Sequence, residues 1–265
     1  MTEQPTPEVR IPEQPDPQVP TGRSTGQPSA QRQLADLAEL VATGPVDLGA
    51  YTQAEMAVVL GDLPALAGVD DEVLAEAVRS LAARGVLHRV PGQRVAEVVG
   101  DLGLLVALAA QSVGTLDIRR GHPGPANAPW RWLISLFGSQ VVGVDRIDAL
   151  GLHRLSLVSV GRVALEVAER MVDGRAKVPA GPDSPVPIAD QEVRRLAEKA
   201  PQRWQLIHRV PRAGVPRLAV DALVVRIDLE RVDLVTRAPD SEGYQRSAVD
   251  VESLAAFLRG LFSIR

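Results

Sequence analysis

The sequence predicts an α+β protein in which a helical N-terminal segment precedes two quasi-repeated halves, each ordered helix, antiparallel sheet, helix, joined into one body. The first observation is helical spacing of apolar residues over 95–113. The second is strand-like alternation over 130–160 followed by a helical pattern over 161–172. The third is the return of the same order of patterns over 188–264, which predicts a repeat of layout.

Composition limits the possible classes of protein. The 265 residues include no Cys, so disulfides, thiolate catalysis and Cys-ligated metal sites are excluded. A formal net charge of -4 argues against a dedicated nucleic-acid binder, which needs a basic surplus to contact phosphates. Without Cys, the chain fits a reducing compartment, and we expect a cytoplasmic protein.

Residues 1–30 are predicted to be a disordered Pro-rich tail, because they are rich in Pro, Gln, Glu and Thr and have few apolar residues to bury. They lack the apolar stretch of a signal peptide. Nowhere do 18 apolar residues run together, so we expect no membrane insertion.

Residues 31–92 form the predicted helical, winged-helix-like segment. Leu34, Leu37 and Val41 lie on one face of a helix that Gly44-Pro45 ends. Thr52 and Glu55 have the spacing of a capping box at the start of a second helix. Asp70 or Asp71 is expected to cap a third helix, Gly85 to end it in a left-handed conformation, and 86–90 to form a short strand.

The first α+β half is predicted over 93–173. It comprises the helix over 95–113, strands over 115–120, 132–137, 140–144 and 153–160, and the helix over 161–172. A Pro/Gly linker is predicted over 174–187. The second half, 188–265, comprises a helix over 188–200, strands over 204–210, 218–228, 231–237 and 244–248, and a closing helix over 249–264.

No pattern of catalytic chemistry is found, so we expect a non-enzymatic protein without cofactor or metal. There is no Gly-Lys pair for a phosphate loop and no nucleophile elbow. The four histidines are far apart in the sequence and have no zinc-ligand spacing. Asp145 and Asp148 are the best carboxylate pair, and we expect them to be surface charges at a strand end.

Two functional interpretations are favoured, and an enzyme whose site is assembled from residues distant in the sequence is a third. The three N-terminal helices and the following strand are typical of a winged helix, so one alternative is a DNA-binding transcriptional regulator with a C-terminal sensing or dimerisation domain. The third helix is acidic at Asp70, Asp71, Glu72 and Glu76, which would repel phosphates. A winged helix can also serve as a protein-interaction module, which is the other interpretation.

Several short phrases point to a known family. Leu81-Ala-Ala-Arg-Gly85-Val-Leu, the strand Leu116-Asp117-Ile118-Arg119, the step Gly243-Tyr244 and the final helix resemble the EspG-type chaperones of type VII (ESX) secretion in actinobacteria. The resemblance spans residues 34–264. It implies a cytosolic, two-half α+β chaperone that holds the apolar helical tip of a secreted PE/PPE-like or WXG-like protein client before export.

A chaperone of this kind needs apolar side chains rimmed by polar groups. The predicted contact surface combines the second-half sheet with the closing helix, and the aromatic cluster after Arg119-Arg120 adds two tryptophans. The candidate partner-binding residues are Trp130, Trp132, Leu223, Val225, Ile227, Phe257, Leu261 and Phe262. For each of them, a place in the core is the alternative to a place at the interface.

Overall fold

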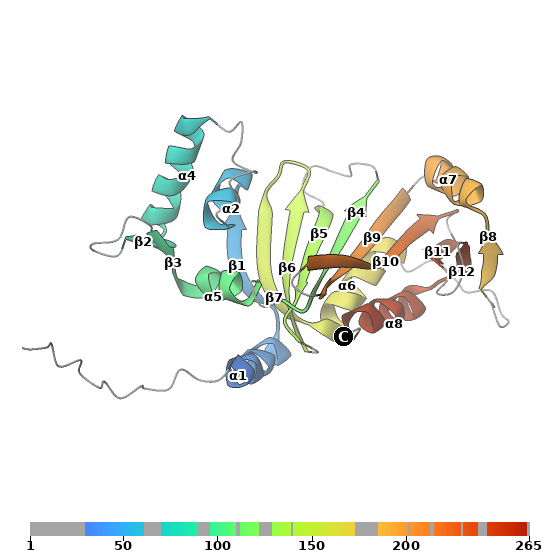
Figure 1. Ribbon diagram of the computed structural model, residues 1–265, viewed down its shortest axis with the longest axis horizontal. Coiled ribbons are helices and arrows are strands. Elements are labelled where there is room, and N and C mark those ends of the chain that lie inside the picture. Colours follow the sequence, from blue (N-terminus) through green and yellow to red (C-terminus); the bar gives the residue numbers. More distant parts are fainter. Residues whose placement is uncertain are drawn as a thin grey trace, which may run out of the picture.

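The computed structural model describes residues 30–60, 70–89, 96–109, 112–121, 129–138, 140–172, 185–200, 202–212, 215–228, 230–237 and 243–263. The predicted tail over 1–30, apart from Ala30, and most of the predicted linker over 174–187 lie outside these residues. Helices and antiparallel strands together make the α+β fold that the sequence predicts (Figure 1).

The N-terminal segment contains α1 (Ala30–Thr43), β1 (Val46–Tyr51), α2 (Gln53–Leu60), α4 (Asp71–Ala83), β2 (Leu87–Arg89) and β3 (Ala96–Val98). The predicted capping box is confirmed: Thr52 N donates to Glu55 Oε2 at 2.8 Å, and Glu55 N donates to Thr52 Oγ1 at 3.2 Å. Asp70 caps α4 by accepting from Glu72 N, and Gly85 follows α4 with φ +70°. β1 was not predicted, and it pairs with β7 of the main sheet.

The helix predicted over 95–113 is wrong in its first part. Ala96–Val98 is a strand that pairs with Leu87–Arg89 as a hairpin, and α5 extends only from Gly100 to Ala109. Gly100 has φ +69°, a left-handed conformation that interrupts the helical path between β3 and α5. The apolar spacing is therefore shared between a short strand and a shorter helix.

The two predicted halves follow in order. The first contains β4 (Gly114–Arg120), β5 (Pro129–Leu136), β6 (Val141–Asp148), β7 (His153–Ser159) and α6 (Val160–Val172). The second contains β8 (Val186–Ile188), α7 (Asp190–Lys199), β9 (Gln202–Arg212), β10 (Val215–Arg226), β11 (Val232–Arg237), β12 (Tyr244–Ala248) and α8 (Val251–Phe262). The layout repeat is confirmed, and β8 is an addition that was not predicted.

The described strands other than β2 and β3 form one sheet in the order β1-β7-β6-β5-β4-β9-β10-β11-β12-β8. Antiparallel pairing of β4 with β9 joins the two halves at the centre. β1 and β8 each add one strand at an outer edge.

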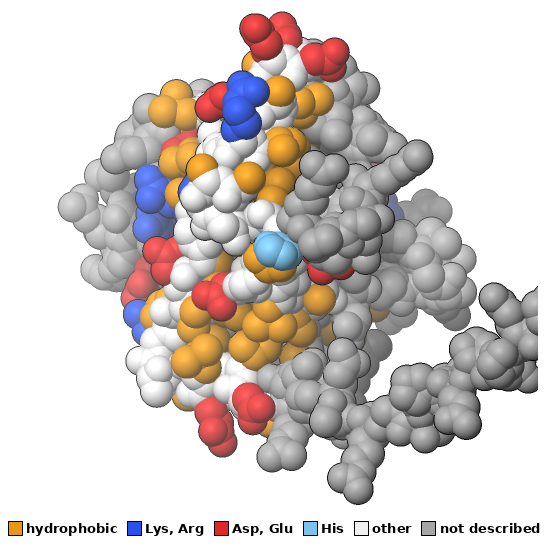
Figure 2. Space-filling model, turned by 90° about the vertical axis from the view of Figure 1, so that its left-hand side faces the viewer, with side chains coloured by type: hydrophobic (Ala, Val, Ile, Leu, Met, Phe, Trp, Pro, Cys, Tyr) orange, Lys and Arg blue, Asp and Glu red, His pale blue; other side chains and the backbone are white. Residues whose placement is uncertain are grey.

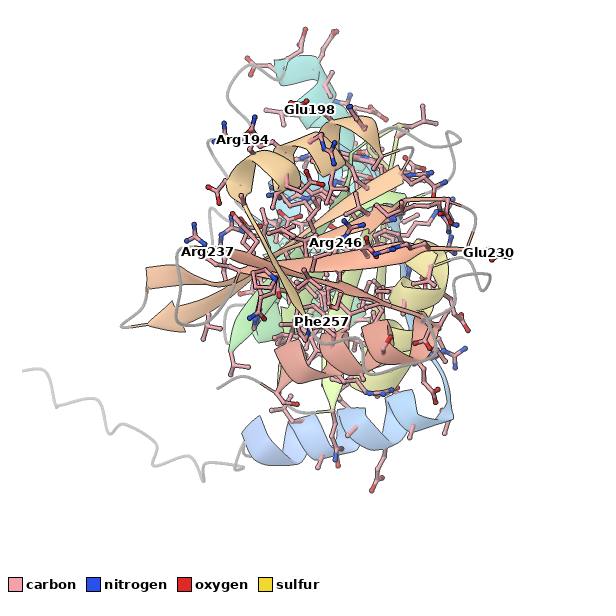
Figure 3. All side chains as sticks on the ribbon, turned by 90° about the vertical axis from the view of Figure 1, so that its right-hand side faces the viewer. Arg194, Glu198, Glu230, Arg237, Arg246 and Phe257 are labelled. Atoms are coloured by element: carbon pink, nitrogen blue, oxygen red, sulfur yellow. The ribbon has the colours of Figure 1, made fainter. Side chains whose placement is uncertain are left out.

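The two faces of the sheet are covered differently. α6 and α8 lie against one face and bury a large apolar core with it, which includes the tilted pair Trp132 and Trp204 at a centroid distance of 5.2 Å. On the other face, α1 and α5 pack over β6 and β7, and α7 packs over β10 and β11. Figure 3 shows α7 and α8 on opposite sides of the second-half strands.

Two carboxylates occupy equivalent places in the halves. Asp145 on β6 is contacted by His153 on β7, with 2.7 Å between Oδ2 and Nδ1. Asp233 on β11 is contacted by Arg246 on β12 in the same way. In both halves, the residue whose side chain contacts the Asp lies two positions earlier in its strand than the residue whose backbone pairs with the Asp. The two halves therefore share the register in which their strands pair as well as the order of the strands.

The register also locates a local twofold axis. Following the paired residues strand by strand from Asp145 toward the centre of the sheet leads to Asp117 on β4. The same path from Asp233 leads to Arg203 on β9. Two residues further along each strand lie Arg119 and Gln205, which are paired with each other. The axis therefore passes through the pair Arg119–Gln205, on the face that α6 and α8 do not cover.

His208 on β9 provides a test of the buried core. Its side chain is 0% exposed, and neither ring nitrogen meets a hydrogen-bond partner among the described residues. Burial lowers the pKa of His208, because the charged imidazolium would lose its hydration. The unfolded chain therefore takes up a proton below about pH 6.5 that the folded chain does not.

We expect the free energy of unfolding to decrease as the pH falls below about 6.5, by at most about 1.4 kcal/mol per pH unit from this one group. His208→Leu should remove this contribution, so the variant gains stability relative to the wild type on going from about pH 7 to about pH 5. Urea unfolding followed by tryptophan fluorescence measures the difference. The exposed His88→Leu serves as the control, and an identical pH profile for His208→Leu and wild type would contradict the prediction.

Candidate partner-binding face

The middle of the sheet is left uncovered on one side by the described helices. α5 lies over β6 and β7, and α7 lies over β10 and β11, so the face of β5, β4 and β9 is open between them. Arg119 and Gln205, at the local twofold axis, are both exposed there. Leu133 and Ile207, on either side of Asp117, are half-buried. We call this surface the open face.

A buried carboxylate organises the centre of the open face. Asp117 is 2% exposed and accepts from Arg119 Nη2 at 2.6 Å and from Arg131 Nε at 2.9 Å. Burial alone would raise the pKa of Asp117, but the hydrogen bonds and positive charges of the two arginines outweigh it and hold the pKa below its usual value. Both guanidinium groups are thereby fixed in orientation at the surface.

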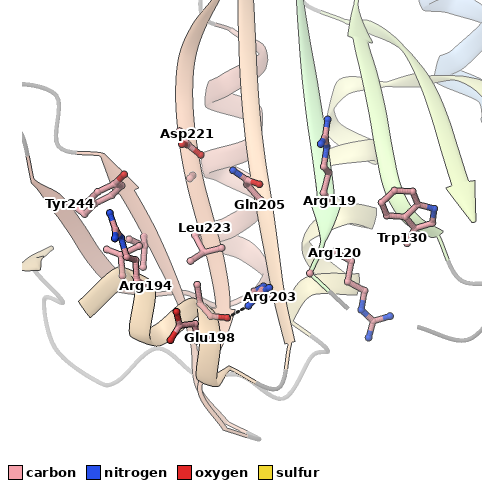
Figure 4. Close-up of a pocket in the computed structure, with 15 residues that line it drawn as sticks. Arg119, Arg120, Trp130, Arg194, Glu198, Arg203, Gln205, Asp221, Leu223 and Tyr244 are labelled. Atoms are coloured by element: carbon pink, nitrogen blue, oxygen red, sulfur yellow. Dashed lines mark hydrogen bonds between the residues drawn. The ribbon is translucent and has the colours of Figure 1, made fainter. Parts of the chain in front are cut away.

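A hollow of about 580 Å³ lies between the open face and α7. Its lining includes Arg194 and Glu198 from α7, Leu223 from β10, Tyr244 from β12 and Trp130 from β5. Figure 4 shows these side chains around the hollow, with Arg203 joined to the α7 backbone by the bond from its Nη1 to the carbonyl oxygen of Ala197. The hollow combines apolar and aromatic surface with an excess of arginine.

A second hollow, of about 560 Å³, continues from the first. Arg120, Gly121 and Trp130 line both, and the second extends to Gln53 of α2 and Leu150 of the β6–β7 turn. Trp130 is half-buried, so part of its ring remains available between the hollows. The two hollows form a continuous depression from α7 to α2.

The structure divides the predicted contact residues into three groups. Trp130 and Leu223 line the first hollow, and Ile227 is half-buried in the cluster under α7. Val225 is 0% exposed beneath α7. Trp132, Phe257, Leu261 and Phe262 belong to the core on the opposite face, where only Phe257 is more than slightly exposed.

The eight residues therefore do not form one surface. Alternation along β10 turns Leu223, Val225 and Ile227 toward α7, whereas α8 packs on the other side of the sheet. Trp132, Val225, Leu261 and Phe262 are buried and have structural roles within one chain, so the prediction that they belong to the contact surface was wrong. The physical reason is burial: α7 covers Val225, and the other three pack in the core on the opposite face of the sheet.

Sequence reasoning noted Arg119 beside the two tryptophans but missed Gln205, Arg194 and Arg203 as site residues. The alternation of Leu116-Asp117-Ile118-Arg119 indicated a strand with one polar face, which was the available signal. The pairing of β4 with β9 is long-range, so no local pattern indicates that these residues meet. The Asp145–Asp148 prediction was also wrong: Asp148 is 5% exposed, and Asp145 is bonded to His153.

The DNA-binding alternative depends on α4, which would be the recognition helix. The hairpin of β2 and β3 follows α4 as a wing would. Both basic side chains of α4 and its cap are engaged within the chain, Arg79 with Glu76 at 2.7 Å and Arg84 with Glu55 at 3.3 Å. α4 thus presents mainly carboxylates, which DNA phosphates would repel.

The described residues contain no group of three or more His, Cys, Asp or Glu placed to hold a metal ion. His153 contacts Asp145 at 2.7 Å and Gln53 at 2.8 Å, which accounts for both of its ring nitrogens. None of the described helices is long and apolar enough to cross a membrane.

No protein-family model matches this chain, and no curated protein matches it in sequence. Among solved structures, it is similar to the chaperone EspG5 of the Mycobacterium tuberculosis type VII secretion system, solved in complex with a PE25–PPE41 dimer. The match covers 70% of this chain and 83% of that chain, with 9% identity and a TM-score of 0.44. A likeness at this level does not establish a shared partner.

Asp117→Asn should destabilise the fold by about 2 kcal/mol, because two guanidinium groups lose their buried counter-charge. The pKa of Asp117 is depressed in the folded state, so its contribution is present above about pH 4 and is lost as the pH falls through the folded-state value. The gap between variant and wild type should therefore be constant from about pH 5 to about pH 8 and shrink below about pH 4. Urea unfolding measures it, and Asp221→Asn on the same face is the control. A gap that widens in acid would contradict the prediction.

Proposed function

We propose that this protein is a non-enzymatic, protein-binding chaperone or adaptor whose client docks on the open face. The observation that carries the proposal is the gap in the helical layer: α5 and α7 cover the two ends of one sheet face, and the strands between them remain open. Sheet faces in α+β folds are normally covered by helices. A client helix placed between α5 and α7 would complete the layer.

The chemistry of the open face suits such a client. The backbone groups of β5, β4 and β9 are already paired within the sheet, so a client binds through side chains. Trp130, Leu223 and Leu133 offer apolar contact, and the ordered guanidinium groups of Arg119 and Arg131 can meet client carboxylates or helix C-terminal carbonyls. An apolar core with an arginine rim is typical of protein-binding surfaces.

For the client, we propose the apolar helical tip of a secreted PE/PPE-like or WXG-like protein, held in the cytosol before export. This follows from the family resemblance of the short phrases around Gly85 and Leu116–Arg119. EspG5, to which the fold is similar, was solved with a PE25–PPE41 dimer. The class of the client and the surface that binds it are two separate proposals.

The test is capture of partners from the lysate of the host cell by the tagged full-length protein, with bound protein and DNA identified at low and high salt. A helical secreted protein should stay bound at high salt, because apolar contacts are not screened. Trp130→Ala combined with Leu223→Ser should reduce its recovery about tenfold or more. Phe257→Ser on α8, on the opposite side of the sheet, is the matched control and should leave recovery unchanged (Figure 3).

The opposite result, loss of the client with Phe257→Ser and not with the open-face variant, would move the contact surface to α8. Recovery of DNA that elutes as salt rises would indicate binding through counterion release and would support the regulator alternative. A bound protein of another class, sensitive to the open-face variant, would retain the binding face and reject the client class.

A further inference from the structure

A third hollow, of about 820 Å³, lies between α2 and α4. These two helices lie at the opposite end of the sheet from α7 (Figure 1). Ala54 and Ala57 line the hollow from α2, and Val73 and Ala77 line it from one face of α4. Leu150, in the turn between β6 and β7, lies at its edge. We call it the α2–α4 groove; its walls are mostly small or apolar side chains.

The spacing of α2 and α4 is fixed by a buried carboxylate. Glu55 is 5% exposed and accepts from Ser80 Oγ of α4 at 2.7 Å, pairs with Arg84 at 3.3 Å and binds the Thr52 amide at 2.8 Å. These bonds tie α2 to α4 at the base of the groove. The groove is therefore a preformed feature of the fold.

Leu150 is presented to solvent by an ordered turn. Its side chain is 80% exposed, yet its backbone N–H donates to the carboxylate of Asp148 at 2.9 Å, as does that of Leu152 at 3.0 Å. Asp148 is itself buried, so the turn is anchored from within. An apolar side chain held outward in this way is suited to bind a partner, since little conformational freedom is lost on contact. Val73, across the groove, is 49% exposed.

The α4 side of the groove is acidic: Glu76 lines it, and Asp71 and Glu72 lie in the first turn of the same helix. Acidic side chains gather at the start of α4, as Figure 2 shows. Among the described residues, neither Asp71 nor Glu72 forms an ion pair, whereas Glu76 is paired with Arg79. A partner with basic side chains would find complementary charge beside the apolar groove.

We propose that the α2–α4 groove binds an amphipathic α-helix of a partner protein, with its apolar stripe against Leu150 and Val73 and its Lys or Arg side chains beside Asp71 and Glu72. The walls are helices, whose interior backbone groups are already paired, so an extended segment would find few partners for its own N–H and C=O groups. A helix satisfies its own backbone. Gln53, Leu150 and Gly151 line both this groove and the second hollow, but the groove lies at the α2 end of that depression, away from Leu223, and does not depend on the proposed function.

Two other occupants fit less well. Residues 1–29 contain seven prolines and more acidic than basic residues, so this segment opposes both the helical form and the charge that the groove favours. A second copy of the chain would have to supply a basic amphipathic helix, and the most amphipathic described helices, α6 and α7, carry acidic residues with their arginines. Each of these two occupants would give a distinct result in the binding experiment.

The test is a fluorescence-anisotropy titration of the full-length protein against labelled synthetic helices of about 18 residues. One peptide carries a Leu/Ala stripe with Lys on its polar face, a second replaces each Lys by Glu, a third has Pro at its centre, and a fourth reproduces residues 1–29. We expect the Lys peptide to bind and the others to bind at least about tenfold more weakly.

Leu150→Ser should weaken binding of the Lys peptide about tenfold, because the apolar anchor is lost. Asp71→Lys with Glu72→Lys should weaken it similarly and abolish its sensitivity to salt. Matched controls are Val186→Ser, which is 57% exposed at the other edge of the sheet, and the exposed Glu169→Lys on α6; both should bind as the wild type does. All variants change exposed side chains, and thermal unfolding checks that they fold.

The proposal is overturned if the Lys peptide fails to bind, if the Glu peptide binds equally, or if Leu150→Ser has no effect. Binding of the 1–29 peptide in competition with the Lys peptide would assign the groove to the chain's own tail. Self-association in sedimentation that Leu150→Ser abolishes would assign it to a second copy. A failure to capture a client on the open face does not change the outcome of the peptide titration, so the two proposals are tested independently.

Discussion

β4 and β9 are paired from Thr115–Arg209 to Arg120–Trp204, and this ladder makes one sheet of two four-stranded halves. Each half alone would end in an exposed strand at the centre, with unpaired backbone groups. Once the ladder forms, α6 and α8 come side by side and bury their apolar faces in a shared core. The open face, its hollows and the local twofold axis all follow from this pairing.

Buried carboxylates explain why arginine and not lysine is needed at the centre of the sheet. Asp117 is contacted by Nε and Nη2 of Arg119 and by the same pair of atoms of Arg131. Asp233, 0% exposed, is held by Arg231 and Arg246. A planar guanidinium gives two bonds of fixed direction to one carboxylate, which the compact ammonium group of a lysine does not reproduce. The same bonds orient the positive charge of the open face.

Much of the fold could be predicted because local signals were strong. The capping box of Thr52 and Glu55, the cap at Asp70 and the Gly85 stop depend on neighbours within a few residues, and all are confirmed. The strand Tyr244–Ala248 has the predicted bounds. The short strands β1, β3 and β8 were missed, because three to six residues give too little periodicity and their strand form depends on pairing with distant segments.

The candidate site could be predicted only in part, for a similar reason. Trp130 and Leu223 were identified from their apolar character, but Phe257, Leu261 and Phe262 were grouped with them although α8 lies on the other side of the sheet. Sequence patterns indicate which residues are apolar and not which face of a shared sheet they reach. Arg119 and Gln205 meet through a pairing of strands about 86 residues apart, which no local pattern encodes.

The local twofold axis through Arg119 and Gln205 has a further consequence for the origin of the chain. An isologous contact places the same residue positions of two copies against each other, and the β4–β9 ladder has this form. Joining the two subunits of such a dimer into one chain would give this order of strands, with β1 and β8 as later additions that protect the outer edges. The central ladder is then the former subunit interface of a duplicated ancestor, and the open face is the surface that spanned both subunits.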